Sequence, residues 1–130
     1  MSDIQAAIGL AQLQDLQHRV DKKRVIFEKY AQAFEGLKTQ SETSGAQSNR
    51  WLSAFVFENP LLTMNSLASY DIETRLSWKP MHLQPIFKDA ISYLDGTSEY
   101  LFKSVLCLPS GVGLTEQQQD YVIDHLKKAT

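Results

Sequence analysis

Apolar residues recur every three or four positions through the first third of the chain. This spacing is typical of one face of an amphipathic helix, because about 3.6 residues make one turn. Ser2 and Asp3 suit its start, since their side chains cap free backbone N–H groups and an acidic group is favourable at the positive helix end. The apolar stripe consists of Leu13, Leu16, Val20, Phe27, Tyr30, Phe34 and Leu37.

This predicted helix would run for roughly ten turns, which is long for a globular protein. We therefore expect a break near residues 15–17. Gly9 is a candidate bend. Gly36 is a candidate C-terminal stop, because glycine readily adopts the left-handed backbone that ends many helices.

The first part of the helix is apolar on several sides. A helix of this kind is normally buried from more than one direction. A domain of this size offers too little surface to cover it, so we expect another surface to pack there. The residues concerned are Ile4, Ala6, Ala7, Ile8, Leu10, Ala11 and Leu13.

The rest of the chain alternates short apolar runs with helix signals. Asn59-Pro60 suits a helix start, with Asn as the cap and Pro at the first position, and Thr115 to Gln118 forms a capping box that opens a final helix. Further helices are expected at 59–69 and 98–103, and strands at 51–57, 72–78 and 105–108. This order predicts a single α+β domain over 1–130, with a helix region at 1–40. A small three-stranded sheet with helices on one side is expected within 49–130.

Composition narrows the function classes. The 130 residues suit one domain. The formal net charge of −2 argues against a general nucleic-acid binder. Cys107 is alone, so no internal disulfide can form. We find no run long enough to span a bilayer and no leader-like start, so we expect a cytoplasmic protein without membrane contact.

Polar and aromatic side chains crowd into the segment from Arg75 to Pro85. Two prolines stiffen it, and loops held on a rigid scaffold are where binding groups concentrate. The candidate site residues are Arg75, Trp78, Lys79, His82 and Gln84. Structural roles are equally open: His82 could lock its loop through a backbone carbonyl, Trp78 could anchor the core, and Arg75 could pair with Glu73 or Asp71.

Other chemistry finds little support. The three histidines, at 18, 82 and 125, are too scattered for a metal site. Cys107 lies in an apolar strand and is expected to be a buried structural thiol. Ser110 to Gly113 is interpreted as a turn because it lacks a nucleotide-binding fingerprint. The basic run 22–24 is interpreted as a solvated helix face.

Four blocks in order resemble a known family. They are residues 1–13 (MSDIQAAIGLAQL), 49–52 (NRWL), 72–85 (IETR followed by WKPMHLQP) and 107–115 (CLPSG with Leu114-Thr115). This pattern resembles the C-terminal domain of the DegT/DnrJ/EryC1/StrS aminotransferases. These pyridoxal-phosphate enzymes aminate keto-sugars, mostly as nucleotide sugars. The resemblance implies the small C-terminal domain of a fold-type I transferase.

In that family the lysine that binds the cofactor lies upstream of this region, and no lysine of this sequence matches it. The resemblance therefore implies no catalytic residue and no bound cofactor in this chain alone, and no transaminase activity. Pyridoxal phosphate belongs to the full-length enzymes, in which this domain helps to close the substrate cleft. Contacts to a nucleotide-sugar are implied for Arg75, Lys79, His82 and Gln84, with Trp78 stacking or lining the pocket.

Three interpretations follow from the resemblance. The chain is the C-terminal part of a sugar aminotransferase, a non-catalytic assembly or binding module, or one half of a split enzyme. The expected partners are a second copy joined through the apolar N-terminal helix, giving a dimer, or a separate chain carrying the large lysine domain. The family context suggests biosynthesis of sugars for surface polysaccharides, glycans or antibiotics.

Overall fold

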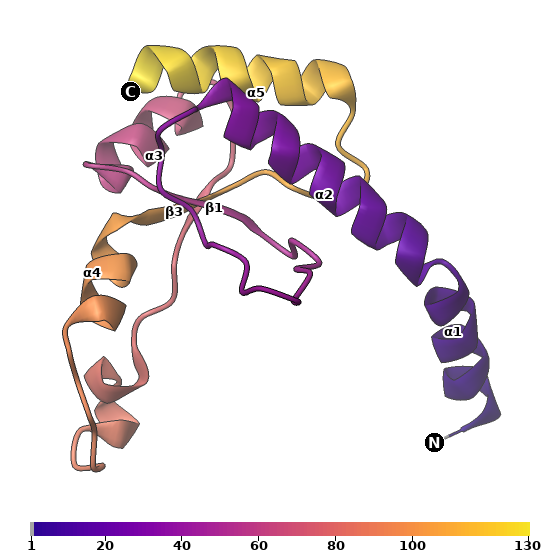
Figure 1. The fold of residues 1–130 in the computed structure, drawn as a ribbon, viewed down its shortest axis with the longest axis horizontal. Coiled ribbons are helices and arrows are strands. Elements are labelled where there is room, and N and C mark those ends of the chain that lie inside the picture. Colours follow the sequence, from indigo (N-terminus) through magenta and orange to yellow (C-terminus); the bar gives the residue numbers. More distant parts are fainter. Residues whose placement is uncertain (1) are drawn as a thin grey trace.

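A computed structural model describes residues 2–130; Met1, the first residue of the first resembling block, lies outside the described residues. Figure 1 shows the arrangement of its elements. The helices are α1 (Asp3–Gln14), α2 (Leu16–Ala33), α3 (Pro60–Ala68), α4 (Thr97–Ser104) and α5 (Glu116–Ala129). The strands are β1 (Ser53–Val56), β2 (Arg75–Leu76) and β3 (Val105–Leu108), and two 3-10 turns cover Met81–Leu83 and Pro85–Phe87.

The long N-terminal helix is broken where the sequence predicts it. Asp15 ends α1 and precedes α2, and its carboxylate accepts from Arg19 Nε at 2.7 Å. Helix α2 ends at Ala33 with Phe34 as its C-cap, so it stops before the expected glycine. Gly36 lies two residues after the cap and has a left-handed φ of +103°. At Gly9, the expected bend, α1 continues without interruption from Asp3 to Gln14, so the break lies at Asp15 and not at the glycine.

The three strands form an antiparallel sheet in the order β1-β3-β2. Phe55, Leu106 and Leu76 lie opposite one another across the sheet, and their side chains therefore share one face. That face packs against α2, α3 and α5, and Phe27 of α2 stacks on Phe55 at 5.5 Å between ring centroids. The predicted α+β class with helices on one side of a three-stranded sheet is confirmed.

Local helix signals are also confirmed. Asn59 Oδ1 accepts a hydrogen bond from the Leu62 backbone N–H at 3.2 Å, with Pro60 as the first residue of α3. Thr115 and Gln118 form the expected capping box of α5. Each signal depends on residues within one turn of the chain, so the sequence alone suffices to reveal it.

The strands are shorter than predicted. The segment expected at 72–78 pairs only at Arg75 and Leu76, which lie opposite Cys107 and Leu106 of β3. Ile72 and Thr74 are still buried, so their apolar and β-branched character indicates packing rather than sheet pairing. The expected strand at 51–57 begins only at Ser53.

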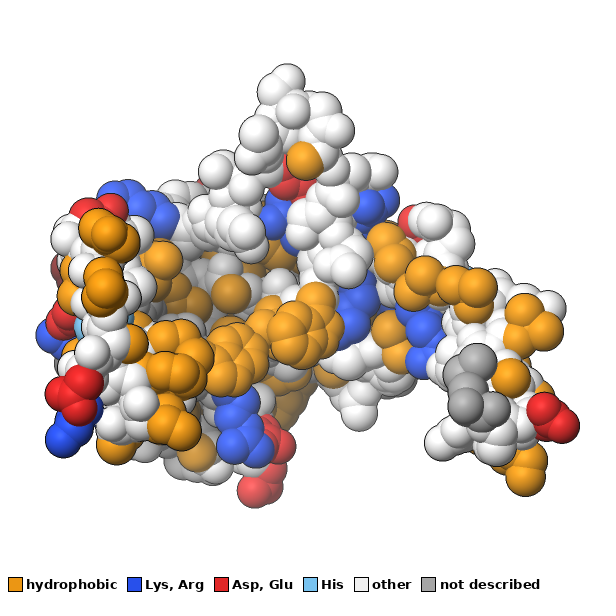
Figure 2. Space-filling view, turned by 90° about the horizontal axis from the view of Figure 1, so that it is seen from below, with side chains coloured by type: hydrophobic (Ala, Val, Ile, Leu, Met, Phe, Trp, Pro, Cys, Tyr) orange, Lys and Arg blue, Asp and Glu red, His pale blue; other side chains and the backbone are white. Residues whose placement is uncertain are grey.

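The other face of the sheet is left uncovered by helices. Figure 1 shows α1 with the lower part of α2 descending on one side of the sheet, and α4 with the 3-10 turns descending on the other. Figure 2 shows the molecule from below, with hydrophobic side chains gathered between the α1–α2 side and the α4 side of the sheet and along both. Ala54, Cys107 and Arg75 share this face by register.

Candidate functional site

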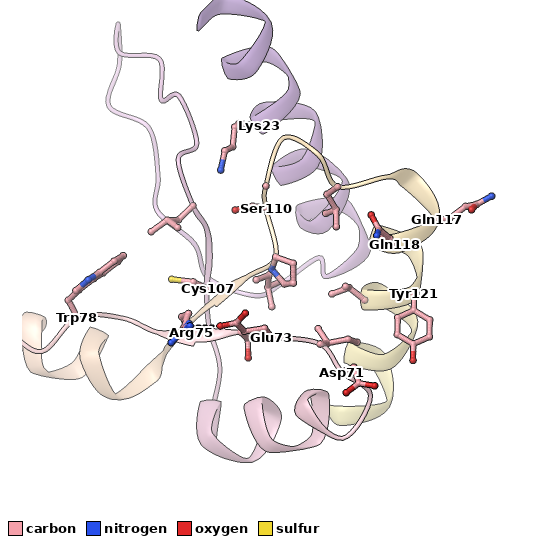
Figure 3. Close-up of a pocket in the computed structure, with 18 residues that line it drawn as sticks. Lys23, Asp71, Glu73, Arg75, Trp78, Cys107, Ser110, Gln117, Gln118 and Tyr121 are labelled. Atoms are coloured by element: carbon pink, nitrogen blue, oxygen red, sulfur yellow. Dashed lines mark hydrogen bonds and ion pairs between the residues drawn. The ribbon is translucent and has the colours of Figure 1, made fainter. Parts of the chain in front are cut away.

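A cavity of about 810 Å³ opens beside this uncovered sheet face. Its walls come from β2 and the residues before it, the end of β3 with its following loop, the first turns of α5, and Lys23 of α2. We call it the main cavity. In Figure 3, Trp78 stands at one end of the main cavity and Tyr121 at the other. Its size is suited to a small organic ligand.

Long-range contacts hold the loop after β3 in place. The buried hydroxyl of Tyr30 donates a hydrogen bond to the Pro109 carbonyl at 2.9 Å, and burial raises the pKa of Tyr30 well above its usual range. The Leu114 N–H donates to the Gly111 carbonyl at 3.0 Å, so the segment from Ser110 to Gly113 is the expected turn. Ser110 itself lines the main cavity.

Arg75 presents its guanidinium at the main cavity. It forms an ion pair with Glu73, which is one of the structural roles left open by the sequence. Both side chains are largely exposed, at 80% for Arg75 and 74% for Glu73. An ion pair in water contributes little free energy, so the Arg75 side chain can exchange this partner for a ligand anion.

Lys23 also lines the main cavity, although it comes from a distant helix. Its Nζ donates to the Trp51 carbonyl at 2.8 Å, and burial lowers the pKa of its ammonium group. Its neighbour Arg24 donates from Nε to the Ser48 carbonyl at 2.8 Å. The interpretation of 22–24 as a plain solvated face is therefore wrong for Lys23 and Arg24, because the loop before β1 folds onto them. Figure 3 shows Lys23 pointing from α2 toward the loop that carries Ser110.

The structure brings together only two of the five predicted site residues. Arg75 and Trp78 line the main cavity, whereas Lys79, His82 and Gln84 do not. Lys79 extends into solvent, and its carbonyl accepts from Gln84 Nε2 at 3.1 Å.

His82 lies in a different place from Arg75 and Trp78. Its Nε2 is 3.1 Å from Glu99 Oε1 of α4, and it lines a separate pocket of about 210 Å³ formed with residues 87–94. This contact locks the loop, as the structural interpretation proposes, but through a carboxylate rather than a backbone carbonyl.

Sequence analysis missed Trp51 as a member of this region. Trp51 stacks on Trp78 with ring centroids 6.0 Å apart and an angle of 22° between the rings. Two tryptophans in a short chain were the available signal, but the sequence gives no measure of the distance between them. Cys107 of β3 is buried, as predicted.

We tested whether these residues could hold pyridoxal phosphate or a metal ion. The cofactor needs a lysine amine with which it can form a covalent bond, and basic side chains that bind its phosphate. The lysine in the main cavity donates to a backbone carbonyl, and Arg75 is paired with Glu73. Because the Lys23 amine is held by this carbonyl, the residues that line the main cavity do not fit the cofactor by themselves. Within residues 2–130 no group of three or more His, Cys, Asp or Glu could hold a metal ion.

Comparison with known proteins identifies the class. The sequence model of the DegT/DnrJ/EryC1/StrS aminotransferase family matches residues 1–127. The chain therefore belongs to this family, as the four blocks predict. EpsN of Bacillus subtilis (strain 168), assigned as a pyridoxal phosphate-dependent aminotransferase, is 40% identical over 97% of this chain and 35% of its own length. GDP-perosamine synthase of Vibrio cholerae is 27% identical over 98% of this chain and 37% of its own length. The chain thus spans about 35% of its first curated relative.

Solved structures agree on the fold. A family aminotransferase from Brucella abortus superposes with a TM-score of 0.85 and 28% identity, over 96% of this chain and 35% of that one. The sugar aminotransferase Spr1654 from Streptococcus pneumoniae, in its PMP form, gives a TM-score of 0.84 and 25% identity over 99% and 35%. We find no helix in residues 2–130 with the length and apolarity to cross a bilayer.

Proposed function

We propose that this chain is the C-terminal part of a pyridoxal phosphate-dependent aminotransferase that acts on a nucleotide-linked keto-sugar. Its role is to form one wall of the substrate cleft. The main cavity carries the proposal, because Arg75 of β2 and Trp78 just after that strand line it together. The names of two relatives support the substrate class, since one is a sugar aminotransferase and the other makes a GDP-linked sugar.

The predicted site residues divide into two groups under this proposal. Arg75 binds the diphosphate, because a guanidinium forms strong charge-assisted hydrogen bonds to phosphate oxygens. Lys79 is exposed beside the cavity and adds positive charge. Gln84 and His82 hold the loop that presents these groups, through the Lys79 carbonyl and Glu99.

Cofactor chemistry is assigned to residues outside this chain. When bound, pyridoxal phosphate supplies the electron sink for amino transfer. The residues described here bind and orient the substrate against it. We propose accordingly that the chain alone carries no transaminase activity, and that the complete enzyme works as a cytoplasmic dimer in glycan or polysaccharide sugar biosynthesis.

A fusion enzyme tests the proposal. The chain is joined to the preceding two thirds of EpsN, and amino transfer from glutamate to nucleotide-linked keto-sugars is measured. We expect the fusion to be active and the chain alone to be inactive. Arg75→Ala should raise KM roughly ten- to a hundredfold, since a hydrogen bond to a charged group contributes about 1.5–3 kcal/mol.

The matched control is Arg19→Ala, because Arg19 pairs with Asp15 and does not line the main cavity. Its KM should equal that of the unaltered fusion. Amino transfer by the isolated chain, or an Arg75→Ala fusion indistinguishable from the control, would overturn the proposed role.

A second candidate is an assembly module without catalysis, and the exposed α1 favours it. No residue of the described α1 is buried, and Ile4 and Leu13 are 74% and 64% exposed. We propose that the large domain of the family fold covers this helix, either in the same chain or in a separate one. An inactive fusion that still binds the large domain would favour the assembly module.

A further inference from the structure

We propose that the stacked pair of Trp51 and Trp78 forms the binding site for the nucleobase of the substrate. The base stacks on the face of Trp78 turned toward the main cavity, and Trp51 supports Trp78 from behind. This inference rests on the proposed function and adds which part of the nucleotide-sugar the chain recognises and through which residues. Trp51 becomes a positioning residue that sequence analysis did not single out.

The exposure of the two rings is the first argument. Trp51 and Trp78 are each 66% exposed. Large aromatic rings left in water forgo substantial burial free energy. A stacked and exposed pair of this kind offers an aromatic face on which a flat ligand ring can stack.

Both tryptophans are held by the fold rather than by each other alone. Lys23 Nζ donates to the Trp51 backbone carbonyl at 2.8 Å. The backbone N–H of Trp51 donates to Asn49 Oδ1 at 3.3 Å. Next to Trp78, the Ser77 N–H donates to the Val105 carbonyl at 3.2 Å. The Ser77 hydroxyl donates to the Leu101 carbonyl at 3.1 Å. A platform fixed in advance loses little conformational entropy when a ligand binds.

The cavities on either side show which ring receives the ligand. Trp78 lines the main cavity and also a second cavity of about 440 Å³, whereas Trp51 lines only the second. Their centroid distance of 6.0 Å lies within the range of rings in contact, about 4.5–7 Å. A ligand ring therefore stacks outside the pair, on Trp78, and not between the two indoles.

The charges in the main cavity favour a nucleotide base over a bare sugar ring. Arg75 and Lys23 both line it with Trp78, together with the carboxylates of Asp71 and Glu73. Glu73 is the exposed partner of Arg75, so a ligand phosphate has to replace it to reach the guanidinium beside the aromatic face. A nucleoside diphosphate matches this combination, with phosphate for the cations and a π face for the indole. Stacking is tolerant of base identity, because every base has a π face.

Indole NMR signals provide a direct test on the chain itself. The sequence contains two tryptophans, and both belong to the pair. UDP and GDP are titrated against the ¹⁵N-labelled chain, with inorganic pyrophosphate and glucose as probes that lack a base. We expect the Trp78 indole signal to shift and saturate with both nucleotides and to stay in place with pyrophosphate and glucose.

Variants define the roles of the two rings. Trp78→Ala should weaken UDP binding about tenfold, and Trp78→Phe should recover part of the loss because it keeps an aromatic face. Trp51→Ala should weaken binding less, since Trp51 acts through Trp78. Tyr93→Ala is the control, because Tyr93 is 95% exposed and lies outside the main cavity.

The remaining outcomes separate this inference from the proposed function. If the backbone NMR signals of Arg75 and Lys23 shift while the indole signals stay in place, the nucleobase site is overturned and the diphosphate contacts are retained. Indole shifts with glucose alone would replace the base by a sugar ring and also overturn it. If no ligand shifts any NMR signal, the proposed nucleobase site is overturned. The activity of the EpsN fusion decides the proposed function independently.

Discussion

Cys107 lies in the middle strand of the sheet, and the residue is 6% exposed. Burial raises the pKa of this thiol, because a thiolate would lose hydration there. The folded state then holds the proton more tightly than the unfolded chain. The stability contributed at this site is therefore complete below the unfolded-state pKa and is lost as the pH rises through the folded-state pKa.

The reactivity of Cys107 follows from the same burial. At pH 8 we expect the native chain to react with a disulfide reagent at least roughly a hundredfold slower than the urea-unfolded chain, since access requires a local opening of a few kcal/mol. The matched control moves the thiol to an exposed position through Cys107→Ser with Ser92→Cys. That variant should react at a similar rate folded and unfolded, and equally fast labelling of native Cys107 would contradict the burial argument.

Residue roles were predictable to different degrees. The thiol of Cys107 was predictable from its apolar neighbours, and Arg75 and Trp78 from the density of binding groups in their segment. The inward contacts of Lys23 and Arg24 were not, because their acceptors are 28 and 24 residues away. Nothing in a basic run on a helix reveals which carbonyls will fold onto it.

At the scale of elements, two helices begin with the same device but differ in what they pack against. Ser2 with Gln5 and Thr115 with Gln118 both form complete capping boxes. Helix α5 buries Val122, Ile123 and Leu126 in the core, whereas the described α1 buries nothing. Only one of these caps is therefore coupled to global unfolding.

Substitution of the two caps tests this difference. Thr115→Ala should lower the free energy of unfolding in urea by about 1 kcal/mol, because the α5 start loses its side-chain acceptor. Ser2→Ala should change it by less than about 0.5 kcal/mol, the usual range for surface changes. Equal losses from the two variants would show that α1 unfolds together with the core.

Helices were easier to predict than strands for a physical reason. A cap and a 3.6-residue period are local, so α3, α5 and the break at Asp15 follow from the sequence. The length of a strand depends on its partner, and β2 is limited to two residues by its pairing with β3. Apolar alternation over 72–78 marks burial but cannot report how many residues are paired.

At the scale of the whole molecule, the exposed apolar surface of α1 has a consequence for the chain in solution. Ile8 and Leu13 are both more than half exposed, and clustered apolar groups in water favour association. Light scattering should show an average mass that rises with protein concentration. Ile8→Glu with Leu13→Glu should abolish that rise, because charges at the contact would have to lose their hydration.

The control for this measurement adds the same charge to the polar positions of the same helix, through Gln12→Glu with Gln14→Glu. It should leave the association unchanged, which separates lost apolar contact from charge repulsion. A clean monomer at high concentration would contradict the expected self-association.

The sequence by itself determined the family, the α+β class, the helix caps and the stiff segment that carries Arg75 and Trp78. These depend on local periodicity and on residue order, which a linear chain displays directly. Tertiary structure alone decided that Lys23 reaches the cavity of Arg75, that His82 turns away to Glu99, and that Trp51 stacks on Trp78. These contacts join segments far apart in the chain, and only the packing of the sheet against its helices sets such distances.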